Sequence, residues 1–142
     1  MSENPAAEKQ LLSTLTFSVR WGEMDALGHV NNAQYLRYFE ESRVAWTASL
    51  GVFLHAQGES MILLKAAVTY KKPVTYPCDV RVDLFAGDVG RTSFNLLNTL
   101  TIVGDTAPAA IGEFVIVWFD YIQQKSIPVP ASLRALLMGE TT

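Results

Sequence analysis

The residues best suited to chemistry lie close together near the amino terminus of the chain. Asp25 stands seven positions before Asn32, with Gly28 and His29 between them. A carboxylate can activate a water molecule or attack a carbonyl carbon directly. The amides at the start of a helix can stabilise negative charge, because they lack partners and the helix dipole is positive there. If a helix begins near Asn32, this segment offers a carboxylate and an anion-binding amide within reach, and Gly28 allows a tight turn between them.

Other side chains compete for these roles, and each also has a purely structural interpretation. Asp25 could serve only to tie its loop through hydrogen bonds. An imidazole is a residue type suited to proton transfer, and His29 could hold the carboxylate, contact a substrate or simply bond to the backbone. Glu41 is a second candidate acid or part of a solvated helix face. His55 and the scattered acids lack the spacing of metal ligands, so we expect no metal site.

A long helix is the element that would position these groups. Its pattern covers residues 32–50, about 28 Å of helix, with Asn31 or Asn32 as a suitable N-cap. Gly51 follows where a left-handed C-cap belongs. The apolar residues that recur at helical spacing are Leu36, Phe39, Trp46 and Leu50.

Strand patterns account for most of the remaining chain. They cover residues 16–21, 61–72, 80–84, 92–103 and 111–121, and a short helix is expected at 132–138. The last four strands have no long helix between them, so we predict that they are antiparallel. One antiparallel sheet packed on one long helix is an α+β architecture. We expect residues 1–14 to be a flexible tail and residues 15–142 to form a single domain.

Composition narrows the class of protein. The 142 residues are 49% hydrophobic and 18% charged, which is typical of a folded domain and excludes disorder for most of the chain. The net charge of −3 argues against a general nucleic-acid surface. The single cysteine, Cys78, cannot form an internal disulfide. We find no signal-peptide pattern and no apolar run long enough for a membrane helix, so we expect a cytoplasmic protein.

The block from Trp21 to Glu41, WGEMDALGHVNNAQYLRYFEE, resembles the signature of the 4-hydroxybenzoyl-CoA thioesterase family, a branch of the hotdog-fold thioesterases. The family's aspartate, small-residue turn and helix start match Asp25, Gly28 and the pair at 31–32. Weaker likenesses follow at residues 70–73, 79, 90–93 and 127–130, so the resemblance covers about residues 15–132. Glu23 stands where many relatives have aspartate, but it lies off the proposed catalytic position.

The resemblance implies a hotdog fold, in which an antiparallel sheet wraps around one long helix. It also implies an acyl-CoA thioesterase, a hydrolase that converts a thioester into a free acid and coenzyme A. Asp25 would be the nucleophile or general base, the backbone amide near Asn32 would polarise the carbonyl, and His29 would assist. The expected substrate-binding residues are Gly28, Asn31, Tyr35, Glu41, Lys71, Arg91, Thr92 and Ser93.

The expected substrate is a thioester of coenzyme A or of acyl carrier protein, so coenzyme A would be part of the substrate and no separate cofactor is expected. Both carriers present phosphate, which basic side chains such as Lys71 and Arg91 could bind. The family likeness further implies a homodimer or homotetramer. Two alternatives stay open: a hotdog protein that binds acyl-CoA without catalysis, and a hotdog hydratase or dehydratase. The histidine-based signature of that second group does not resemble the block described above.

Overall fold

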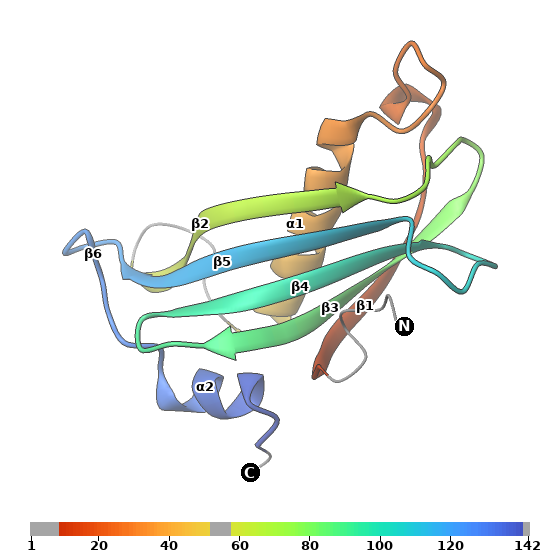
Figure 1. Ribbon diagram of the computed structural model, residues 1–142. Coiled ribbons are helices and arrows are strands. Elements are labelled where there is room, and N and C mark those ends of the chain that lie inside the picture. Colours follow the sequence, from red (N-terminus) through yellow and green to blue (C-terminus); the bar gives the residue numbers. More distant parts are fainter. Residues whose placement is uncertain (1–8, 52–57, 141–142) are drawn as a thin grey trace.

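A single sheet and one long helix make up most of the chain (Figure 1). The computed structural model describes residues 9–51 and 58–140. The elements in chain order are β1 (Leu11–Ser18), the 3-10 helix η1 (Trp21–Glu23), α1 (Asn32–Ser49), β2 (Glu59–Tyr70), β3 (Asp79–Val89), β4 (Ser93–Ile102), β5 (Ala110–Asp120), β6 (Lys125–Ser126) and α2 (Ala131–Leu137). This order confirms the predicted strand, long helix, four strands and short final helix.

The strands form one antiparallel sheet in the order β1-β3-β4-β5-β2, and the short β6 pairs with β5. The hairpin between β4 and β5 turns at Gly104, whose φ of +104° suits a glycine. The helix α1 lies across one face of this sheet (Figure 1). The α+β prediction is therefore confirmed, and β2 is left at an edge of the sheet.

The core forms between α1 and the covered face of the sheet. Phe39 is fully buried and meets Phe114 of β5 edge to face, with ring centroids 5.7 Å apart. The expected apolar stripe of α1 is correct for Phe39 but wrong for Leu36 and Leu50, which are 41% and 37% exposed. Tyr35 and Tyr38 take buried positions instead, where their rings meet Tyr70 of β2 and Phe17 of β1.

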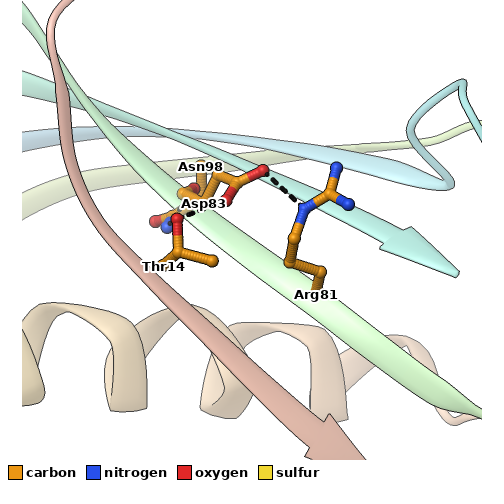
Figure 2. Close-up of polar contacts among 4 residues, drawn as sticks. All are labelled: Thr14, Arg81, Asp83 and Asn98. Carbon is orange, nitrogen blue, oxygen red and sulfur yellow. Dashed lines mark hydrogen bonds and ion pairs between the residues drawn. The ribbon is translucent and has the colours of Figure 1, made fainter. Parts of the chain in front are cut away.

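Polar residues also fix the helix on the sheet. The buried Asn98 of β4 donates to the Ser42 hydroxyl of α1 at 3.1 Å and to the backbone carbonyl of Asp83 at 3.0 Å. Figure 2 shows the Asp83 carboxylate itself held between Thr14 of β1 and Arg81 of β3, at 2.8 and 3.1 Å. These bonds join α1, β1, β3 and β4 and hold the middle of the helix, at Ser42, on the sheet.

The start of the ordered chain differs from the prediction. The tail expected to reach residue 14 is wrong from Leu11 onward, because β1 begins there and pairs with β3. A register shift between Leu11 and Ser13 interrupts the alternation by which a strand is recognised in sequence. Trp21, expected inside that strand, lies in η1 and is 75% exposed. No helix in the described ranges is long and apolar enough to cross a membrane.

Candidate active site

The loop that carries Asp25 is closed by its own backbone. Met24 and Val30 form an isolated antiparallel bridge at its base. The Asp25 N–H donates to the His29 carbonyl, and the Gly28 N–H donates to the Asp25 carbonyl, both at 3.0 Å. Gly28 has a φ of +80°, which a residue with a side chain adopts only with strain. The turn expected between the acid and the helix is therefore present and depends on this glycine.

The Asp25 carboxylate is half-buried and is held at both oxygens. Its Oδ1 accepts the Leu27 N–H at 2.9 Å, and its Oδ2 accepts Nδ2 of Asn31 at 3.2 Å. The Oδ1 of Asn31 accepts the Ala33 N–H at 2.9 Å and so caps α1. One asparagine side chain thus connects the carboxylate to the first turn of the helix.

The first amide of α1 is available for a ligand. Ala33 and Gln34 both donate their N–H groups to Asn31, whereas the N–H of the exposed Asn32 has no partner in the described part of the chain. The Asn32 carbonyl accepts the Tyr70 hydroxyl at 2.7 Å. This bond restrains the peptide between Asn32 and Ala33, next to the peptide that carries the free N–H. An unpaired amide at the positive end of the helix dipole is suited to bind a developing oxyanion.

Two surface hollows flank the loop. The first, about 550 Å³, is lined by Trp21, Gly22, Met24, Asp25, Gly28 and Tyr76. The second, about 280 Å³, is lined by His29, Val30, Asn32, Tyr35, Tyr70, Lys71, Lys72 and Pro73. Asp25 therefore lines one hollow and Asn32 lines the other.

Most of the predicted site residues gather at this end of the sheet. His29 and Lys71 are exposed on the second hollow, and the buried Tyr35 forms part of its wall. Glu41 does not join them: it lines a separate hollow of about 610 Å³ between α1 and β1. It stands nine residues beyond Asn32, which is about 14 Å along the helix. His55 lies outside the described residues.

The basic turn at residues 91–93 lies at the opposite end of the sheet from Asp25 (Figure 1). Ser93 pairs with Val117, whereas Leu100 pairs with Ala110, which in turn pairs with Tyr70 beside the site. The seven residue-to-residue steps between positions 93 and 100 span about 23 Å of strand. Within one chain, the structure does not bring Arg91, Thr92 and Ser93 to the Asp25 loop.

Sequence reasoning missed two aromatic residues and one hydroxyl at the site. Trp21 and Tyr76, which are 75% and 44% exposed, form walls of the hollow that contains Asp25. Tyr70 was assigned only to a strand end, yet its hydroxyl holds the Asn32 peptide. The alternating pattern of residues 16–21 groups Trp21 with apolar residues expected to be buried, so the sequence did not predict its exposure.

Comparison with known proteins agrees with this fold. Residues 19–137 match the thioesterase-like superfamily. The chain belongs to this superfamily and has the hotdog fold of its members.

Individual relatives support the assignment. A solved Pseudomonas aeruginosa protein named "a putative Thioesterase" is 42% identical, with a TM-score of 0.85, over 90% of this chain and 99% of that one. "A putative acyl-CoA thioesterase" from Xanthomonas campestris is 33% identical, with a TM-score of 0.71, over 77% and 93%. A "Putative esterase" of Aquifex aeolicus is 35% identical over 79 residues, 54% of this chain and 62% of its own length. These relatives support a thioester hydrolase.

Proposed function

We propose that the protein hydrolyses acyl-CoA thioesters at the Asp25 loop. One observation carries this proposal: Asn31 holds the Asp25 carboxylate and also caps the helix whose first amide, at Asn32, is unpaired. The acyl-CoA substrate is supported by the Xanthomonas relative, whose name includes that activity. The acyl group itself stays open between short, long and aromatic chains.

Two routes use the same residues. In the first, Asp25 attacks the thioester carbon while the Asn32 N–H binds the oxyanion, and the C–S bond breaks to release coenzyme A as a thiolate that takes a proton from water. Water then hydrolyses the acyl–aspartyl anhydride and restores the carboxylate. In the second, Asp25 accepts a proton from the attacking water and passes it to the departing thiolate. His29, exposed on the second hollow, would contact the substrate.

We also propose that two copies of the chain complete the site. The edge strand β2 exposes Ile62, Leu63 and Leu64 by 39%, 45% and 68%, an apolar edge open to a further strand. A two-fold axis beside β2 reverses the direction of the second sheet. The far end of that sheet, with its Arg91 turn, would then approach the Asp25 loop and could bind the carrier's phosphates.

The test is release of coenzyme A from a panel of short, long and aromatic acyl-CoAs by the wild-type chain and by Asp25→Asn. We expect the variant to lose at least about 100-fold in rate, which corresponds to about 2.7 kcal/mol of barrier. Glu113→Gln is the matched control, because it neutralises an exposed carboxylate of β5 away from the loop. Equal rates for Asp25→Asn and wild type would contradict the proposed role of Asp25.

The same panel separates the alternatives. A protein that binds acyl-CoA without turnover would bind members of the panel but release no thiol from any of them. A hydratase would instead consume the conjugated double bond of an enoyl-CoA while the thioester stays intact. Hydrolysis in labelled water under single-turnover conditions tests the anhydride route: attack of water on the aspartyl carbonyl of the anhydride leaves label in Asp25, whereas the general-base route puts label only into the released acid.

A further inference from the structure

Two tyrosine hydroxyls bond to the two ends of the segment that carries Asp25, and we propose that Tyr38, with Glu23, and Tyr70 are positioning residues for the reaction. This inference rests on the proposed function, since it concerns the loop that carries Asp25 and the Asn32 amide. Neither of these hydroxyls needs to touch the substrate for the inference to hold. Each restrains the position of the Asp25 carboxylate or of the Asn32 amide.

The first end of the loop is fixed through Glu23. Its Oε1 accepts the Tyr38 hydroxyl at 2.5 Å and the Arg20 N–H at 2.9 Å. Its backbone carbonyl accepts the Asn31 N–H at 3.0 Å. Glu23, two positions before Asp25, therefore connects Tyr38 of α1 to Arg20 and to the asparagine that holds the carboxylate.

The other end of the loop is fixed through Tyr70 of β2. Its hydroxyl donates to the Asn32 carbonyl at 2.7 Å. Because a peptide unit is planar, a bond to the Asn32 carbonyl restrains the whole peptide between Asn32 and Ala33, whose N–H also bonds to the Asn31 cap. The peptide that carries the unpaired Asn32 N–H joins this one at the Asn32 Cα, so it adjoins a unit held by both the Asn31 cap and the strand β2.

Tyr35 joins the two anchors into one unit. Its ring meets Tyr38 edge to face at 6.4 Å and Tyr70 edge to face at 5.0 Å. Tyr38 also stacks on Phe17 of β1 at 5.7 Å, with an interplanar angle of 20°. Tyr35 and Tyr38 are only 3% and 4% exposed, so closely packed neighbours restrict both rings.

The position of Tyr38 also keeps its hydroxyl a donor. Burial, followed by the hydrogen bond and charge of Glu23, raises the pKa of Tyr38 far above its ordinary value. The phenol therefore stays protonated through the range in which an esterase is assayed and can donate to Glu23 there. Substitution of Tyr38 or Glu23 removes the bond between them, so the inference can be tested by mutation.

The experiment compares Tyr38→Phe, Glu23→Ala and Tyr70→Phe with the control Tyr121→Phe. The Tyr121 hydroxyl donates to the Met61 carbonyl at 2.7 Å, so the control removes the same kind of bond away from the loop. We expect kcat to fall by about tenfold or more in the three loop variants, with KM within about twofold, because misplaced groups slow the chemical step more than binding. Glu23→Gln keeps an acceptor for the Tyr38 hydroxyl and should restore most of kcat.

Amide hydrogen exchange supplies a readout that needs no substrate. Residues 24–33 should exchange faster in Tyr38→Phe and Tyr70→Phe than in the wild type, and should not change in Tyr121→Phe. Unchanged exchange, or a kcat loss no larger than in Tyr121→Phe, would overturn the inference. If Asp25→Asn keeps full activity while these exchange rates rise, the proposed function fails and the restraint of the loop stands.

Discussion

Substitution of Asn31 by aspartate should separate the two tasks of this side chain. In the wild type, Oδ1 caps α1 through the Ala33 N–H, while Nδ2 donates to the Asp25 carboxylate at 3.2 Å. Aspartate retains an oxygen for the cap but has no donor for Asp25. Alanine removes both bonds. The two variants therefore differ in stability and share the loss of the contact to Asp25.

The expected magnitudes follow from these contacts. Asn31→Ala loses an N-cap, which costs about 1 kcal/mol of unfolding free energy and lowers Tm by about 3 °C in a domain of this size. In Asn31→Asp the cap and the helix dipole favour the new carboxylate by about 0.5 kcal/mol. Opposing this, the new carboxylate repels that of Asp25, but both positions are only partly buried, and solvent screening and side-chain rotation leave a repulsion of about 0.5 kcal/mol. We expect Asn31→Asp to be less destabilised than Asn31→Ala and yet to lose at least about tenfold in kcat.

The assay is thermal unfolding combined with thiol release on the best acyl-CoA of the panel. Repulsion displaces the Asp25 carboxylate or favours its protonated form, so activity of Asn31→Asp should also rise with pH where wild-type activity is flat. A folded Asn31→Asp variant with wild-type kcat would refute the reasoning, because it would show that the bond to Asp25 has no part in catalysis. A Tm loss in Asn31→Asp equal to that of Asn31→Ala would refute the capping argument.

Three further outcomes are expected. Leu63→Lys should yield a monomer with little turnover in light-scattering and thiol-release assays, because it places a charge on the open edge of β2; an active monomer would exclude the two-chain site. Gly112→Ala should lower stability by about 1–3 kcal/mol in thermal unfolding, since its new Cβ would meet buried aromatic atoms at 2.6 Å, whereas Gly58→Ala meets nothing within 4 Å. Burial and then Asp79 raise the pKa of Cys78, so less thiolate exists at neutral pH and alkylation should be slow until the protein is unfolded; rapid labelling of the native chain would contradict a structural thiol.

The helix and the acid loop could be predicted because their signals are local. A cap, a glycine and a left-handed C-cap each act within a few residues, and the helix indeed begins at Asn32 and is followed by Gly51 at a φ of +73°. The turn at Gly28 is another local feature. Features that depend only on neighbouring residues in the sequence, such as the helix start and the Gly28 turn, are therefore predicted correctly.

The remainder depends on partners far along the chain. The bond from Tyr70 to Asn32 joins residues 38 positions apart, and the bond from Tyr38 to Glu23 crosses from α1 to η1. The separation of Arg91 from the loop follows from the register of β4 and β5, which no spacing rule supplies. Glu41 was grouped with the site because it follows the same helix, yet its side of α1 faces β1.

The placement of the site on α1 explains how an unpaired amide is tolerated there. An amide without a partner weakens a helix start, and a short helix would fray at that point. Here the helix extends 18 residues, and Phe39 and Trp46 anchor it in the core well beyond its first turn. The sheet-packed part of α1 therefore keeps the first turn in position, so the Asn32 N–H can stay free for a substrate without loss of the helix that carries it.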